Sequence, residues 1–213
     1  MTNADLTHIY FLLDRSGSMQ SILSDTIGGF DAFIAEQRAT PGQCRVTLAQ
    51  FDTEYEVVYA GTDVADVPSL VLHPRGMTAL HDAMGRLITD AGAGLAALPE
   101  EKRPGTVVVA IMTDGLENAS REWTGDAIRH LVQQQSTTYN WQFLYMGADQ
   151  DAVEVGSKLG VAAANSITYG RQNAAVAMAA TADMISDVRR ARAAGAPAAA
   201  LRGFSDEERR QSR

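Results

Sequence analysis

The feature that most constrains this chain is a short apolar run that ends in closely spaced oxygen-bearing side chains. Residues 9–13 read Ile-Tyr-Phe-Leu-Leu and predict a strand that is buried on both faces of a sheet. Asp14, Ser16 and Ser18 follow at alternate positions, and Gly17 allows the backbone to turn between them. Carboxylate and hydroxyl oxygens are hard ligands that suit Mg²⁺, Mn²⁺ or Ca²⁺. Taken alone, the segment fits equally well a polar turn in which Asp14 or Ser16 caps the next helix.

Two later segments carry the same kind of oxygen donor. Residues 76–80 place the hydroxyl of Thr78 at a predicted helix start, where it fits either an N-cap or a metal ligand. Residues 107–115 contain a second apolar strand that ends in Asp114. The carboxyl ends of parallel strands meet at one edge of a sheet. We therefore expect Asp14, Asp114 and Thr78 to lie close together at that edge.

This arrangement resembles the metal-ion-dependent adhesion site (MIDAS) of the von Willebrand factor A (vWA) family. The family signature is Asp-x-Ser-x-Ser, a distant Thr and then an Asp after an apolar strand, and the matching residues are Asp14, Ser16, Ser18, Thr78 and Asp114. The resemblance covers roughly residues 6–170. It implies a Rossmann-like three-layer α/β/α fold with a mostly parallel central sheet, one antiparallel edge strand and helices on both faces. It also implies that these five residues hold a divalent cation whose coordination is completed by an Asp or Glu of a protein partner.

Hydrophobic periodicity and turn residues place the remaining elements. Strands are predicted at residues 6–13, 45–51, 54–59, 106–112, 141–147 and 165–169. Helices are predicted at residues 19–38, 79–96, 124–135, 151–159 and 173–194, and a capping box at 205–208 predicts a short final helix. The short turn Asp52-Thr53 predicts a hairpin, so one of the two strands beside it runs antiparallel at the sheet edge. We divide the chain into a core domain, residues 1–170, and a C-terminal helical extension, residues 171–213, that packs on the domain or trails from it.

Other polar residues near the predicted site are interpreted as structural. Glu117 and Asn118 are expected to hydrogen-bond within their loop rather than to bind the cation directly. Asp149 and Asp151 follow a strand and could border the site, but capping of the next helix is the favoured role. His81 lies in the first turn of a helix and is interpreted as a surface or packing residue.

Charge and composition exclude some classes of function. The formal net charge of −8 argues against non-specific nucleic-acid binding. No apolar run approaches the ~20 residues that span a bilayer, and the first residues lack the basic and apolar regions of a signal peptide. Cys44 is the only cysteine, so no intrachain disulfide can form, which favours a reducing compartment. We predict a cytoplasmic protein, similar to the compact stand-alone vWA proteins of bacteria.

The set of donors favours a binding module over an enzyme. Two carboxylates leave a divalent cation electrophilic, so we expect it to accept an external carboxylate, with Mg²⁺ as the expected cation. A phosphatase of related layout needs a second carboxylate two residues after the first, where this chain has Ser16. No P-loop sequence occurs. Two alternatives stay open: a metal-dependent, phosphatase-like hydrolase, and a scaffold whose site is unused.

Overall fold

A single six-stranded sheet forms the centre of the molecule. The computed structural model describes residues 2–149, 151–197 and 200–213. The strands are β1 (Asn3–Asp14), β2 (Gln43–Phe51), β3 (Tyr55–Asp63), β4 (Pro104–Thr113), β5 (Gln142–Ala148) and β6 (Ser166–Tyr169). Their order in the sheet is β3-β2-β1-β4-β5-β6, and only the edge pair β2–β3 is antiparallel. The predicted mostly parallel sheet with one antiparallel edge strand is therefore confirmed.

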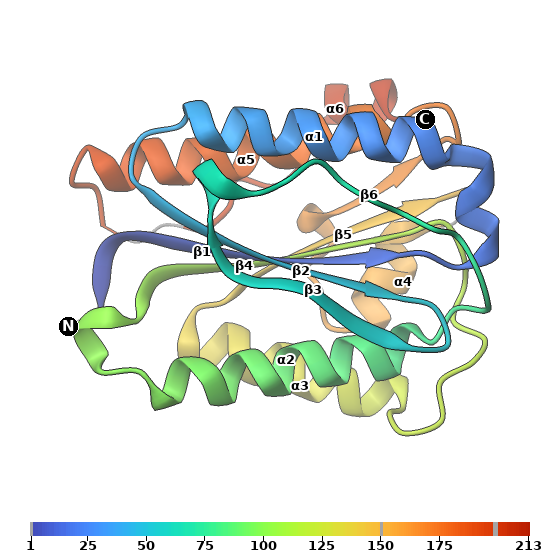
Figure 1. Ribbon diagram of the computed structural model, residues 1–213, viewed down its shortest axis with the longest axis horizontal. Coiled ribbons are helices and arrows are strands. Elements are labelled where there is room, and N and C mark those ends of the chain that lie inside the picture. Colours follow the sequence, from blue (N-terminus) through green and yellow to red (C-terminus); the bar gives the residue numbers. More distant parts are fainter. Residues whose placement is uncertain (1, 150, 198–199) are drawn as a thin grey trace.

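Helices cover both faces of this sheet and complete a three-layer α/β/α architecture. They are α1 (Leu23–Ala39), α2 (Leu80–Ala97), α3 (Gly125–Tyr139), α4 (Ala152–Lys158), α5 (Ala174–Ala193) and α6 (Asp206–Gln211). Helices α1 and α5 lie side by side on one face, and α2 and α3 lie on the other (Figure 1). Within the described ranges, no helix combines the length and the apolar character that crossing a membrane requires.

The apolar run in β1 supplies side chains to both cores. Ile9, Phe11 and Leu13 face α1 and α5, whereas Tyr10 and Leu12 face α2 and α3, and all five are buried. This two-sided burial explains why the strand reads as a continuous apolar run rather than as an alternation of apolar and polar residues.

Helix α5 packs closely against α1 on the sheet. A Cβ atom added to Gly29 of α1 would lie 2.8 Å from the Cα of Ala175 in α5, so only glycine allows this approach. Ala177, Met178 and Ile185 of α5 are fully buried against the same face of the sheet. The first helix of the predicted C-terminal extension therefore packs on the domain rather than trailing from it.

Several element boundaries differ from those predicted, and two of the differences have a clear structural cause. The helix expected at 19–38 begins as a 3₁₀ helix, Gly17–Ile22, because the Met19 amide donates to the Ser16 carbonyl at 3.1 Å and tightens the first turn. The strand expected to end at residue 59 continues to Asp63, because the pairing of β2 with β3 shifts register near Leu48 and the strands then pair again.

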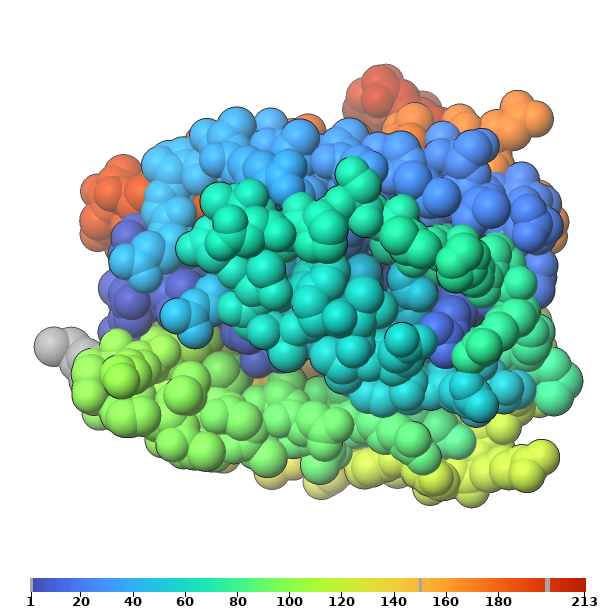
Figure 2. All heavy atoms as spheres, in the orientation of Figure 1, coloured from blue at the N-terminus to red at the C-terminus, as the bar shows by residue number. Residues whose placement is uncertain are grey.

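The segment between β3 and α2 crosses one side of the molecule before it reaches the edge of the sheet. It starts with a 3₁₀ turn, Val64–Asp66, and Figure 2 shows it with β3 between α1 and α2. The Leu70 amide donates to Asp31 at 2.9 Å, and the Gln50 side chain donates to the Val71 carbonyl at 2.7 Å. This path delivers Thr78 to the carboxyl ends of the strands.

Candidate metal centre

Asp14 is the last residue of β1, and its carboxylate is oriented by two donors. One carboxylate oxygen accepts the Ser16 amide at 2.6 Å, and the other accepts the Thr113 hydroxyl at 2.6 Å. Asp14 is completely buried. The turn after β1 and the end of the neighbouring strand β4 therefore fix both oxygens of this carboxylate.

The two serines connect the first loop to the end of β4. The hydroxyls of Ser16 and Ser18 lie 3.1 Å apart, and the Ser18 hydroxyl donates to Asp114 Oδ1 at 2.6 Å. Asp114 directly follows β4, the neighbour of β1 in the sheet. The parallel register therefore brings together donors that are distant in the sequence, as expected for this edge.

Thr78 reaches the same place from a third segment. Its amide donates to Asn118 Oδ1 at 2.9 Å, and its carbonyl accepts the Asn118 amide at 3.0 Å. A Cβ atom added to Gly115 would lie 3.3 Å from Thr78 Oγ1 and 3.7 Å from Ser18 Oγ, so the threonine and serine hydroxyls face the same turn. Helix α2 has Ala79 at its N-cap, so the Thr78 side chain does not cap it. The structure thus gathers all five predicted residues at one edge.

The electrostatics of this cluster fit a divalent cation. Burial, with a smaller contribution from Asp114, raises the pKa of Asp14 to about 6 despite the hydrogen bonds from Thr113 and Ser16. Burial is also the main reason why the pKa of Asp114 is raised. Asp114 Oδ2 is buried and has no hydrogen-bond partner within the described residues. A bound cation would stabilise both desolvated carboxylates and would provide a partner for the buried Oδ2 of Asp114.

The cluster differs from a site made only of acidic, histidine or cysteine ligands. In the part of the chain that the structure describes, no group of three or more His, Cys, Asp or Glu side chains is placed to hold a metal ion. A cation bound here therefore needs the hydroxyls of Ser16, Ser18 and Thr78 beside the two carboxylates. Such an all-oxygen set suits hard cations.

Solved structures are similar to this chain, whereas the two comparisons by sequence find no relative. No protein-family model matches this chain, and no curated protein matches its sequence. The vWF domain of the type V pili tip protein Mfa5 from Porphyromonas gingivalis has a TM-score of 0.63 at 13% identity, over 85% of this chain and 95% of that one. The von Willebrand factor type A protein from Catenulispora acidiphila has a TM-score of 0.57 at 17% identity, over 86% and 42%. Mussel byssus proximal thread matrix protein 1, with a zinc-occupied MIDAS motif, has a TM-score of 0.55 at 13% identity, over 88% and 46%.

This chain has the von Willebrand factor A fold. The identities are low, so the similarity establishes the architecture and not the activity. The chain spans less than half the length of the Catenulispora and mussel proteins. What this chain does therefore depends on its own side chains.

An ion network around the buried Asp52 connects the segment that carries Thr78 to the first loop. Arg15 points away from the donors, and its Nε donates to Asp52 Oδ2 at 3.0 Å, while Arg75 Nε donates to the same oxygen at 2.8 Å. Arg15 also pairs with Glu56. The Arg75 amide donates to the Arg15 carbonyl at 2.8 Å. Burial opposes ionisation of Asp52, but the hydrogen bonds from Arg75, the Glu54 amide and Arg15 outweigh it and lower the pKa of Asp52.

The loop that follows Asp114 is fixed to the start of α2. Glu117 accepts the amides of His81, Ala119 and Ser120 and the Ser120 hydroxyl, at 2.7–2.9 Å. Asp82 accepts the three consecutive backbone amides of residues 121–123 at 2.8–2.9 Å. The prediction that Glu117 and Asn118 hydrogen-bond within this region is confirmed.

Asp149 and Asp151 have different roles. Asp151 caps α4 by accepting the Glu154 amide at 2.9 Å, as predicted. Capping was the wrong expectation for Asp149, which adopts a positive φ of 46° and pairs with Arg171 at 2.7 Å. Arg171 also donates to Ser21 Oγ at 3.0 Å, so the Asp149–Arg171 pair borders the metal centre beside the first loop.

Sequence reasoning missed three supporting residues. The sequence around Thr113 only weakly indicates a role at the site: Thr113 is a polar residue that closes an apolar strand immediately before Asp114. Asp52 and Arg75 carried none, since their partnership depends on how the segment after β3 returns across the molecule. All three support the donors rather than join them.

Proposed function

We propose that this chain is a metal-dependent protein-binding module. Asp14, Ser16, Ser18, Thr78 and Asp114 hold the divalent cation, and an Asp or Glu of a protein partner completes its coordination. The observation that carries the proposal is the convergence of two buried carboxylates and three hydroxyls from three segments, with Asp114 Oδ2 left without a hydrogen-bond partner among the described residues.

The surrounding side chains favour binding over hydrolysis. A cation bound here supplies an open position for an external carboxylate. Asp14 is held on both oxygens by Ser16 and Thr113, so it is poorly placed to accept a proton from a substrate. In the described part of the chain, no histidine side chain is hydrogen-bonded to any of the five donors; His81 lies beside Glu117, with Nδ1 at 3.9 Å from Oε2.

We propose Mg²⁺ as the natural cation and the cytoplasm as the location. The donors are all hard oxygens, which suit Mg²⁺, Mn²⁺ and Ca²⁺ better than softer metals. The zinc-occupied MIDAS of the mussel protein supports a divalent ion at this position of the fold. Cys44 is a free, buried thiol, and burial raises its pKa to about 11, which suits a structural residue in a reducing compartment.

Binding of Mn²⁺, measured by calorimetry and by its electron paramagnetic resonance signal, tests the site. We expect the parent to bind one Mn²⁺ per chain, and Asp14→Asn to bind about 100-fold or more weakly because one of the two anionic donors is lost. Asp14→Asn removes a buried charge, so we expect the metal-free variant to be at least as stable as the parent. Asp126→Asn, an exposed carboxylate at the start of α3, is the matched control. Equal Mn²⁺ affinity of parent and Asp14→Asn would refute the site.

Capture of partners from a cell lysate tests the function. A partner retained in Mg²⁺, released by EDTA and not captured by Asp14→Asn supports the proposal, provided that one Asp or Glu of the partner is essential. Metal-dependent turnover of phosphate esters that disappears in Asp14→Asn would favour the hydrolase instead. Metal binding with neither partner nor turnover would favour a scaffold with an unused site.

A further inference from the structure

A cavity of about 440 Å³ lies between the sheet and the C-terminal half of α2, away from the metal centre. Its walls come from β1, β2, β3, α2 and the connection to β4, and they include His8, Tyr10, Thr47, Tyr55, Leu95 and Leu98. His8 lies in the middle of β1, whereas Asp14 closes the carboxyl end of the strand, and none of the five donors lines the cavity. The cavity and the metal centre are therefore separate sites.

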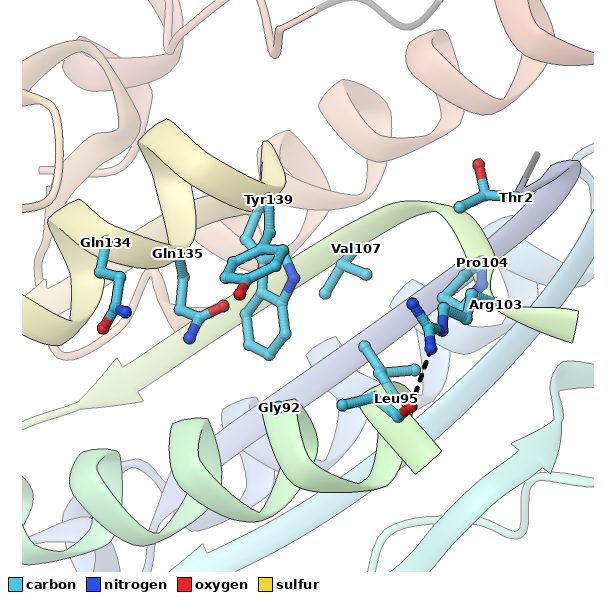
Figure 3. A pocket seen from close by; sticks show the side chains of 11 residues that line it. Thr2, Gly92, Leu95, Arg103, Pro104, Val107, Gln134, Gln135 and Tyr139 are labelled. Carbon is cyan, nitrogen blue, oxygen red and sulfur yellow. Dashed lines mark hydrogen bonds between the residues drawn. The ribbon is translucent and has the colours of Figure 1, made fainter. Parts of the chain in front are cut away.

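Small residues on α2 create this space. Gly94 lines the cavity, and a Cβ atom added to it would meet no other atom within 4 Å. A second hollow of about 290 Å³ lies on the other side of Leu95 and Pro104, and Figure 3 shows it between Gly92 and Leu95 of α2 and Gln135 and Tyr139 of α3. The last turns of α2 thus have open space on two sides of Leu95, which itself packs against the core.

The aromatic side chains of the inner wall are held in place. The His8 ring stacks on Tyr10 with centroids 4.0 Å apart and an angle of 16°, and Tyr10 stacks at 6.1 Å on Trp141. His8 Nε2 lies 2.9 Å from Thr47 Oγ1, which also accepts the Gly61 amide. The His8 and Tyr10 rings cover each other's faces, so a planar apolar ligand can pack beside this fixed stack.

The charged residues at the rim favour an anion. Arg45 and Lys102 line the cavity, both are exposed, and neither has an ion-pair partner within the described residues. Most other arginines of this acidic chain are in ion pairs or donate to backbone carbonyls, so two unpaired cations at one opening are unusual. Asp90 is the acidic residue of the lining, and Arg86 lies one turn before it on α2.

We propose that this cavity binds a small planar aromatic carboxylate, with the ring beside the His8–Tyr10 stack and the carboxylate toward Arg45 and Lys102. The cavity volume is within the range of small-molecule sites, about 300–1,000 Å³, and its mostly apolar wall with a few polar groups is typical of them. The site is independent of the metal-dependent function proposed above.

Titration with 2-naphthoate, followed by NMR chemical shifts of His8 and Tyr10, tests the proposal. Gly94→Leu introduces a large side chain at the cavity wall, and Gly28→Leu makes the same change at another exposed helical glycine, in α1, that also has open space around it. We expect parent and Gly28→Leu to bind alike, and Gly94→Leu about tenfold or more weakly. Thermal unfolding of Gly94→Leu, compared with that of the parent, checks that the variant is folded.

The charge of the probe separates the possible occupants. We expect 2-naphthoate to bind parent at least about fivefold more tightly than 2-naphthylmethanol, and Arg45→Gln to remove this preference. Any of three results would overturn the proposal. These are equal binding of 2-naphthoate and 2-naphthylmethanol, a preference for 2-naphthylmethylamine, and undiminished binding of 2-naphthoate to Gly94→Leu. Dimerisation of the parent that Gly94→Leu abolishes would also overturn it, because a second copy of the chain would then be the occupant.

Discussion

Thr113 illustrates how much one hydroxyl outside the donor set contributes to this site. It donates to Asp14 at 2.6 Å, while its own carbonyl accepts the Tyr169 hydroxyl at 3.1 Å. Tyr169 is completely buried, and burial followed by the charges of Asp114 and Asp14 raises its pKa, so it stays protonated and can donate. A chain of neutral donors therefore holds the carboxylate in place.

His8 makes the stability of the domain depend on pH. Burial, followed by the charge of Arg45, lowers the pKa of His8 to about 4 from 6.5. The unfolded chain therefore binds a proton below about pH 6.5 that the folded chain does not bind until about pH 4, so stability falls as the pH decreases through this range. We expect the unfolding free energy of the parent to fall relative to that of His8→Phe by about 3 kcal/mol at most between pH 7 and pH 4.

Urea unfolding of both proteins across this pH range measures the difference. His8→Phe keeps an aromatic ring beside Tyr10 but cannot titrate. Parallel curves for the two proteins would show that His8 is not responsible.

Among the structural elements, the β2–β3 hairpin acts as the anchor of the metal-centre loops. Asp52 lies in its turn, is 1% exposed and binds both Arg15 and Arg75. We expect Asp52→Asn to destabilise the domain by about 3 kcal/mol, because it removes the buried one of the two carboxylate partners of Arg15. It should also weaken Mn²⁺ binding, since the segment that carries Thr78 is no longer anchored to the first loop.

Arg75→Gln is the matched control for this network. The Arg75 side chain is 56% exposed, so its loss should cost less than about 1 kcal/mol. Chemical unfolding and Mn²⁺ titration compare the two variants. Equal effects of both substitutions would contradict the anchoring role of Asp52.

The contact between α1 and α5 gives a second prediction for the elements. Gly29→Ala places its Cβ against the α5 backbone, so we expect a loss of about 1–3 kcal/mol. Gly28→Ala points into open space and should stabilise α1 by about 0.5–1 kcal/mol through helix propensity. Thermal unfolding of the two variants measures the expected loss of stability in Gly29→Ala and the expected gain in Gly28→Ala. A stabilising Gly29→Ala would mean that the two helices can separate at little cost.

At the scale of the whole molecule, the core on one face of the sheet includes residues of α5. The division at residue 170 predicted from sequence leaves α5 outside the core domain, whereas α5 buries the face formed by Ile9, Phe11 and Leu13. We expect a chain that ends at residue 170 to lose cooperative folding, because this apolar face would be exposed.

A chain that ends at residue 197 tests the last segment separately. It keeps α5 but lacks α6, whose Arg209 donates to the Ser166 carbonyl at 2.6 Å and to the carbonyls of residues 163 and 164 at 3.0 Å. We expect it to fold with reduced stability at β6. Circular dichroism and urea unfolding distinguish the two truncations. Cooperative unfolding of the chain ending at residue 170 would establish it as an independent domain.

Sequence by itself determined the class of fold and the identity of the candidate donors. Both depend on local patterns: apolar runs of strand length, the helical spacing of buried residues, and oxygen-bearing side chains directly after two strands. The rule that parallel strand ends meet at one sheet edge predicted that Asp14 and Asp114 lie close together, and the pairing of Leu13 with Met112 agrees with it. The 3₁₀ turn at Gly17–Ile22 was not predicted, because its tightening depends on the hydrogen bonds of the first loop.

Only the tertiary structure decided how the site is supported and where space remains. Arg15 lies between two donors in the sequence, yet it points to Asp52 on the hairpin, and that direction depends on the packing of a distant segment. The cavity under α2 likewise arises where small residues of a helix meet one corner of the sheet. Local sequence cannot reveal such features, because contacts between residues that are far apart in the chain create them.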